Sequence, residues 1–205
     1  MGRVFIINEP DEEGNAYPEL LEKRGYKVFS TANAYNLVRY AKELNPDLYI
    51  IDSSLKDTDY RGLVQHLVDN RYSEKAPLVV LKKRLSKTLP QGVSCYLNKK
   101  EALNLLPELA SAYCRGGKKY DVLLLIHDNK LKINAQSLSR KLKISLFCVF
   151  DVKAARIFLQ KNDVRAVGVH CLPEKYDDIK KNLPADKIFY VENLANIKDL
   201  VSFVS

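Results

Sequence analysis

The sequence has no tryptophan and one methionine, and it has no long apolar run. A helix that crosses a bilayer needs about 20 consecutive apolar residues, so we expect no membrane insertion. The early apolar run Val4–Ile7 is too short for the core of a secretory signal, and no cleavage-like segment follows it. We therefore expect a cytoplasmic protein.

Cysteines are also scarce, and no two of them have the C-x-x-C spacing of a metal or redox motif. Each lies in or beside an apolar run, which is typical of reduced and buried thiols. A disulfide framework would be unusual in a chain of this size and expected compartment.

Basic residues outnumber acidic ones by 33 to 25, giving a formal net charge of +8. Residues 1–115 carry 17 basic and 15 acidic side chains, whereas residues 116–205 carry 16 and 10. An excess of this kind can attract an acidic partner or a nucleic acid. The basic segments contain no interleaved aromatics and no nucleic-acid motif, so binding of a nucleic acid is only the second alternative.

The first 115 residues alternate short apolar segments with amphipathic ones. This alternation predicts parallel strands covered by helices on both faces, that is, an α/β domain over residues 1–115. The expected strands are 3–8, 26–31, 47–52, 76–82 and 94–98, and the expected helices are 17–25, 33–47, 60–70 and 101–114.

Residues 116–119, between Arg115 and Tyr120, interrupt this alternation with two glycines followed by two lysines, and they predict a linker. The alternation then restarts over 120–205, which predicts a second, shorter domain of the same kind. When the predicted elements of the two halves are aligned, Asp128 corresponds to Glu9, His170 to Asp52 and Asn193 to Lys99. The expected strands are 120–128, 144–150, 164–171 and 187–193, and the expected helices are 132–143, 152–163, 173–183 and 194–205.

The first half resembles a response-regulator receiver domain of the chemotaxis type. In that family, an acidic pair follows the first strand and a phosphoacceptor aspartate follows the third strand. A residue with a hydroxyl group follows the fourth strand, and a lysine follows the fifth. Here these positions hold Asn8 and Glu9, Asp52, Lys82, and Lys99. The resemblance implies two flavodoxin-like, doubly wound parallel-sheet domains in tandem, with the second truncated.

The departures from the family pattern concern phosphoryl transfer. That reaction needs Mg²⁺, which prefers several oxygen ligands, and this pocket would offer only the carboxylates of Glu9 and Asp52. Lys82 replaces the hydroxyl residue, and its ammonium could lie near Asp52 together with that of Lys99 and replace the metal. The segment 82–93 is also too short and too broken for a full helix.

We therefore interpret the chain as a phosphorylation-independent pseudo-receiver with no enzymatic output and no cofactor. It would bind protein partners, such as a histidine kinase or a signalling assembly, and a homodimer is a further expectation. The alternative is a response regulator that is phosphorylated on Asp52 with Mg²⁺.

The second half lacks the phosphoacceptor. His127, Asp128, His170 and Asn193 are expected to form the equivalent pocket at its strand ends. Two histidines beside an acid can bind a transition metal. Strand-end polar residues more often bond to loop backbone, and the sequence leaves both readings open.

Overall fold

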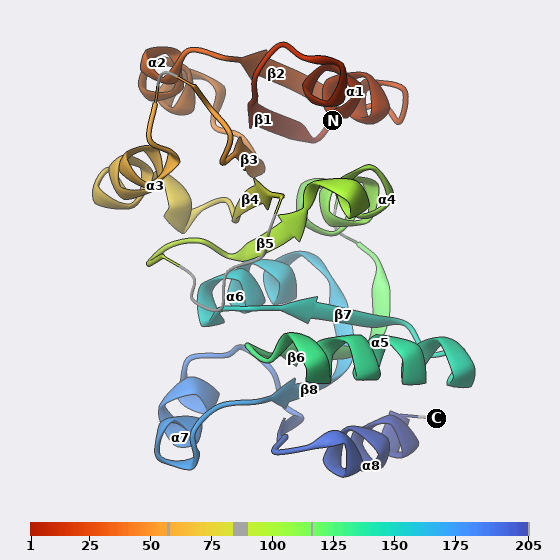
Figure 1. The fold of residues 1–205 in the computed structure, drawn as a ribbon. Coiled ribbons are helices and arrows are strands. Elements are labelled where there is room, and N and C mark those ends of the chain that lie inside the picture. Colours follow the sequence, from red (N-terminus) through yellow and green to blue (C-terminus); the bar gives the residue numbers. More distant parts are fainter. Residues whose placement is uncertain (57, 84–89, 116, 205) are drawn as a thin grey trace. The chain divides into compact units, whose positions relative to one another are not determined.

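The computed structural model describes residues 1–56, 58–83, 90–115 and 117–204. Contacts divide the chain into two compact units, Met1–Gly116 and Gly117–Ser205 (Figure 1). Both units are α/β, and every strand pair in them is parallel. Within the described residues, no helix is both long and apolar enough to cross a membrane.

The first unit has a five-stranded sheet in the order β2-β1-β3-β4-β5. This is the flavodoxin-like doubly wound order, so the fold expected for the first half is confirmed. All five predicted strands are present, and β3 is buried at every residue because the helices cover both faces of the sheet. The strands are β1 (Arg3–Ile7), β2 (Lys27–Thr31), β3 (Leu48–Asp52), β4 (Leu78–Lys82) and β5 (Cys95–Asn98).

Helices α1 and α4 lie on one face of this sheet, and α2 and α3 lie on the other (Figure 1). On the second face, aromatic side chains of the strands, such as Phe5, Tyr49 and Tyr96, join one buried cluster with residues of α2 and α3. The helices are α1 (Glu12–Glu22), α2 (Ala34–Leu44), α3 (Tyr60–Asp69) and α4 (Lys99–Ala110), with a short 3₁₀ turn at Tyr72–Glu74 and a π-helical turn at Ser111–Arg115.

Helix α1 begins five residues before the predicted start at Tyr17. Asp11 caps it, because its carboxylate accepts a hydrogen bond of 2.6 Å from the N–H of Gly14. Pro18 lies inside the helix. Within segment 82–93, expected to lack a full helix, residues 84–89 lie outside the described part of the chain.

The second unit has a four-stranded sheet in the order β7-β6-β8-β9. Its first strand begins at Lys119, inside the segment 116–119 that the sequence predicted as a linker, because Lys119 pairs with Asp163 of β8. The strands are β6 (Lys119–Leu125), β7 (Leu146–Val149), β8 (Asp163–Val169) and β9 (Ile188–Tyr190); the helices are α5 (Asn129–Leu142), α6 (Val152–Lys161), α7 (Pro173–Lys181) and α8 (Leu194–Val204).

Helix α8 closes the core of the second unit. Ile197, Leu200, Val201 and Val204 are buried with apolar residues of β6 and with Ala135 of α5. The apolar stripe of this last helix is therefore used for packing within its own unit. On the opposite side, the rings of Tyr120, Phe147 and Phe158 pack together with centroids 4.5–5.7 Å apart.

Candidate functional site

The polar residues singled out in the first half lie at the carboxyl-terminal edge of the sheet. Asp52 is the last residue of β3 and Lys82 the last of β4. Asn8 and Glu9 follow β1, and Lys99 follows β5. Since parallel strands end at the same edge, the fold brings these five residues to one side of the sheet.

Asp52 and Lys99 form a buried ion pair. The Nζ atom of Lys99 lies 2.5 Å from Oδ2 of Asp52, and their side chains are only 4% and 2% exposed. The other carboxylate oxygen of Asp52 accepts a hydrogen bond of 2.7 Å from the N–H of Ser54. Both oxygens of Asp52 are therefore bonded to groups of the protein itself.

Glu9 is bonded to a loop. Its Oε1 accepts a hydrogen bond of 2.7 Å from the N–H of Lys56, in the loop after β3. Asn8 is buried, and its Oδ1 accepts a 2.8 Å hydrogen bond from the hydroxyl of Ser30, while its Nδ2 donates to the carbonyl of Glu9 at 3.0 Å. Asn8 thus ties the turn after β1 to β2, and Glu9 holds the loop after β3.

Gly14 shapes the same turn, and the sequence analysis did not single it out. A Cβ atom at this position would lie 2.1 Å from the carbonyl oxygen of Glu9 and 2.7 Å from Nδ2 of Asn8. Only glycine lets α1 start this close to the backbone beside the site. A glycine three residues after the capping Asp11 is the sequence feature that marks this approach.

Lys82 contacts two tyrosines of the site. Within the described chain it forms no ion pair with Asp52. Its Nζ atom donates a 3.3 Å hydrogen bond to the hydroxyl of Tyr60 and lies 4.6 Å from the ring centroid of Tyr96. The hydroxyl of Tyr60 bonds to the ammonium and the ring of Tyr96 makes a cation–π contact with it, so Lys99 is the cation that pairs with Asp52 among the described residues.

Tyr60 and Tyr96 are members of the site that the sequence analysis missed. Burial alone would raise the pKa of Tyr60, but hydrogen bonds with Arg61, Tyr96 and Lys82 bring that pKa below its ordinary value. Burial, and then the hydrogen bond with Tyr60, raise the pKa of Tyr96. The two phenols and Lys82 therefore join the start of α3 to β5 and to the end of β4.

The residues present do not fit a preformed Mg²⁺ site. Of the two candidate carboxylates, Asp52 is bonded through one oxygen to Lys99 and through the other to Ser54, and Glu9 bonds to the N–H of Lys56. Among the described residues, no group of three or more His, Cys, Asp and Glu side chains could hold a metal ion. Binding of Mg²⁺ would require these contacts to be rearranged.

Strand register relates the second unit to the first. Val169 pairs with Leu125 as Ile51 pairs with Ile7, so His170 occupies the position of Asp52, as expected. The same register matches Glu9 with His127, and the expected match with Asp128 is wrong by one residue. The Oδ1 atom of Asp128 instead accepts a 2.7 Å hydrogen bond from the N–H of Leu131 and caps α5, as Asp11 caps α1.

Asn193 does not correspond to Lys99. Its Oδ1 accepts a 2.8 Å hydrogen bond from the N–H of Ala195 at the start of α8, as Asn98 caps α4 through the N–H of Lys100. The residue that matches Lys99 is then Leu194. In the described second unit, the position that corresponds to Lys99 therefore holds no cation. Among the residues described there, His170, at the end of β8, has no counterpart of Lys99 beside it.

The two histidines lie near each other at this edge. The pKa of His127 is lowered, first by partial burial and also by the positive charges of His170 and Lys175, while Asp151 opposes the shift. Nδ1 of His170 is buried and has no hydrogen-bond partner in the described residues. The expected ligand Asp128 is used as a helix cap, so these residues form no three-ligand metal group.

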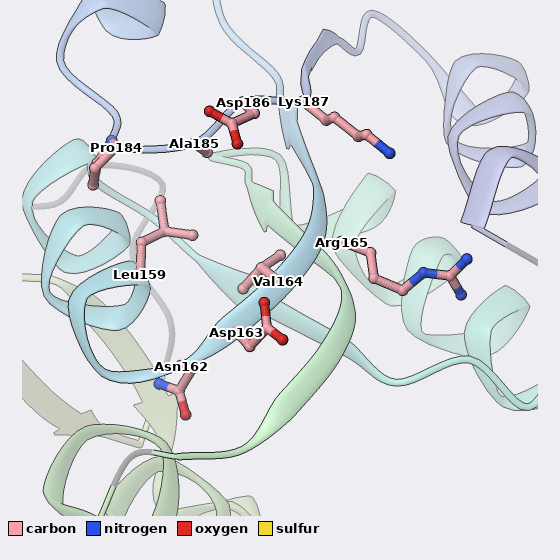
Figure 2. A pocket seen from close by; sticks show the side chains of 9 residues that line it. All are labelled: Leu159, Asn162, Asp163, Val164, Arg165, Pro184, Ala185, Asp186 and Lys187. Atoms are coloured by element: carbon pink, nitrogen blue, oxygen red, sulfur yellow. The ribbon is translucent and has the colours of Figure 1, made fainter.

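A hollow of about 340 Å³ lies at the opposite edge of the second sheet, where β8 and β9 begin (Figure 2). Two of its charged side chains are already engaged, because Arg165 pairs with Asp121 at 3.3 Å and Lys187 lies over the ring of Phe203 at 5.0 Å. None of the residues predicted as a site lines it. The lining residues are Leu159, Asn162, Asp163, Val164, Arg165, Pro184, Ala185, Asp186 and Lys187.

No family model matches the chain, and no curated protein matches it. Among solved structures, the receiver domain from the hybrid histidine kinase CckA is 26% identical, covering 54% of this chain and 96% of that one, with a TM-score of 0.44. The pseudo-receiver domain of the CikA protein is 20% identical, covering 53% and 97%, with a TM-score of 0.42.

The receiver domain of the sensor histidine kinase PA1611 from Pseudomonas aeruginosa PAO1, which has a magnesium ion in its active-site cleft, is 17% identical. It covers 55% of this chain and 98% of its own, with a TM-score of 0.46. Over about half its length, the chain is thus similar to response-regulator receiver domains, including a pseudo-receiver.

Proposed function

We propose that the first unit is a pseudo-receiver that binds protein partners in a signalling pathway without using phosphorylation. The observation that carries this proposal is the Asp52–Lys99 ion pair, in which both oxygens of Asp52 are bonded to the protein and the pair is almost fully buried. The expected cytoplasmic setting and the absence of enzymatic output belong to the same proposal.

Electrostatics supports this view. Phosphorylation of Asp52 would add negative charge at a place where, among the described residues, Lys99 is the cation that pairs with the carboxylate. Mg²⁺ is needed to neutralise the oxygens of the transferring phosphoryl group. The side chain that could add ligands, Glu9, is bonded to the N–H of Lys56, and the neutral Asn8 bonds to Ser30.

The aromatic contacts of Lys82 support the proposal further. A hydroxyl residue at the end of β4 could contact a phosphoryl group on Asp52. Here the position holds an ammonium that is bonded to Tyr60 and packed on Tyr96. The end of β4 therefore carries an ammonium held by two tyrosines in place of a small hydroxyl side chain.

The rival function is a receiver that accepts a phosphoryl group on Asp52 from a histidine kinase. It is favoured by the position of Asp52 at the end of β3, where the receiver family has its phosphoacceptor. Amide NMR of the full chain, titrated with Mg²⁺ and then with beryllofluoride, separates the two functions. We expect no shifts centred on Glu9, Asp52 and Lys99.

The matched control is Asp52→Asn, which keeps the size of the side chain and removes its charge. Shifts around Asp52 in the natural chain that vanish in this variant would overturn the proposed function. If the same shifts occur in both proteins, beryllofluoride binds elsewhere, and the proposal stands.

A further inference from the structure

The edge strand of the first sheet borders an apolar hollow. The hollow has a volume of about 450 Å³, within the range of ordinary ligand sites, and lies between β2 and α2. It lies beside an outer strand, away from Asp52 and Lys99. Its lining residues are Phe5, Val28, Phe29, Ser30, Thr31, Tyr40, Glu43 and Leu44.

The backbone of β2 is unpaired on its outer side in the described sheet, because β2 is the terminal strand and pairs with β1 alone (Figure 1). The N–H of Lys27 bonds to Gly2 and the carbonyl of Thr31 accepts from Asn8, so these two residues point toward β1. Backbone direction alternates along a strand. The N–H and C=O groups of Val28 and Ser30 therefore point outward, beside the hollow.

Two cations lie over the aromatic rings that line the hollow. Nζ of Lys27 is 5.1 Å from the ring centroid of Phe29, and the guanidinium of Arg39 is 5.9 Å from that of Tyr40. The acid in the lining, Glu43, is 3.7 Å from Arg39 and is thereby neutralised. Lys27 forms no ion pair among the described residues, so the rim has an unmatched positive charge.

We propose that this groove binds an extended acidic segment of a partner protein, which adds as a strand to β2. The segment would bond to the outward groups of Val28 and Ser30, insert an apolar or aromatic side chain into the hollow, and place a carboxylate near Lys27. In strand addition, backbone bonds supply affinity and side-chain pockets supply specificity.

An extended peptide uses all three features of the groove. A small aromatic acid would fill the hollow and contact Lys27 but would leave the outward groups of Val28 and Ser30 without partners. A helix would present no free backbone groups to β2. A second copy of the chain could pair through β2, but it would bring Lys27 and Arg39 of both copies into the same region.

This inference rests on the proposed protein-binding function, but it does not depend on the chemistry of Asp52. The probe is a fluorescein-labelled peptide, EVFVED, and its control is KVFVKK, in which the acids become lysines. Binding to the full chain is measured by fluorescence anisotropy. We expect the acidic peptide to bind at least about tenfold more tightly than the basic one, a difference of about 1.4 kcal/mol.

Two variants localise the binding. Lys27→Glu should weaken the acidic peptide by about tenfold or more, whereas Lys23→Glu, the same charge change on the exposed end of α1, should have little effect. Val28→Pro removes an outward N–H and keeps the bonds to β1, because proline is tolerated at an edge strand whose N–H faces away from the ladder. It should also weaken binding.

Amide exchange reports the strand itself, and binding should slow exchange at Val28 and Ser30. Equal affinity for both peptides, equal loss in Lys27→Glu and Lys23→Glu, or unchanged exchange at Val28 and Ser30 would each overturn the inference. Concentration-dependent dimerisation that blocks the peptide would assign the groove to a second copy instead. If Val28→Pro does not fold, the peptide pair and the two lysine variants still decide.

The outcome is separable from the test of the proposed function. If beryllofluoride binds at Asp52 while the acidic peptide adds to β2, the pseudo-receiver proposal fails and the groove stands. If beryllofluoride causes no shifts around Asp52 and the peptide does not bind, the proposal for the groove is refuted while the pseudo-receiver proposal stands.

Discussion

Removing the cation of the buried ion pair tests how the site is stabilised. In Lys99→Met, the side chain keeps a similar length while Asp52 keeps its charge, its bond to Ser54 and its burial at 2% exposure. At 2.5 Å and an effective dielectric of 20, the lost Coulomb attraction is about 7 kcal/mol, part of which is offset because Lys99 no longer loses its hydration. Breaking a buried pair typically costs about 3–5 kcal/mol, and we expect a loss in this range.

The double variant Asp52→Asn with Lys99→Met removes both charges and should recover most of the loss, since what is costly is an unpaired buried charge. The control is Lys23→Met, which breaks a pair of 3.7 Å whose side chains are 77% and 67% exposed. This change should cost less than about 0.5 kcal/mol.

Native-state hydrogen exchange with mass spectrometry is the suitable assay, because peptides from β3 and β4 report the first unit separately from the second. The reasoning is refuted if Lys99→Met loses no more stability than Lys23→Met, or if the double variant is no more stable than the single one. Millimolar Mg²⁺ should leave Lys99→Met unchanged. Recovery with Mg²⁺ would show that Asp52 can use a metal in place of Lys99, against the proposed function.

Three further predictions concern other parts of the chain. The pKa of His127 is lowered in the folded chain, so the unfolded chain binds more protons below about pH 6.5. The second unit should therefore lose stability as the pH falls from 7 to 5.5. Urea unfolding should show this loss in the natural chain and a smaller loss in His127→Gln. Gly14→Ala would place Cβ 2.1 Å from the carbonyl oxygen of Glu9 and should destabilise the first unit by about 1–3 kcal/mol. Gly62→Ala has open space around it and should not destabilise the unit. Thermal unfolding measures both variants. Burial would raise the pKa of Asp121, but bonds from Ser145 and Arg165 lower it. Asp121→Asn should therefore lower the free energy of unfolding of the second unit by about 1 kcal/mol at pH 7 and by less at pH 3. Equal losses at both pH values would contradict this account.

The strands were the most predictable part of the fold. Continuous apolar runs such as Leu48–Ile51 can be buried on both faces, so the sequence pattern and the tertiary environment require the same structure. The start of α1 was less predictable, because Pro18 resembles a helix boundary while the capping role of Asp11 depends on its bond to Gly14. The helix starts at this local cap, which lies several residues before Pro18.

The candidate site was predictable as a position but not as a set of contacts. Parallel topology alone places Asp52 and Lys99 at one edge, and the structure pairs them. The direction of Lys82 depends on Tyr60, which is distant in sequence and reaches Lys82 only through the folded α3. In the second unit, Asp128 was mistaken for a pocket acid because a helix cap and a site carboxylate look the same in a sequence.

The ion pair also has a consequence for the synthesis of the chain. Asp52 emerges from the ribosome with β3, but Lys99 is made only after β5, so the nascent first unit lacks the cation that pairs with this carboxylate in the folded chain. Until Lys99 is made, burying the charged carboxylate of Asp52 would be unfavourable. We therefore expect the carboxyl-terminal edge of the incomplete sheet to remain exposed to water. Ribosome-stalled chains should therefore gain protease resistance in β3 only after Lys99 is exposed, and resistance in shorter chains would show that the pair is dispensable for closing the core.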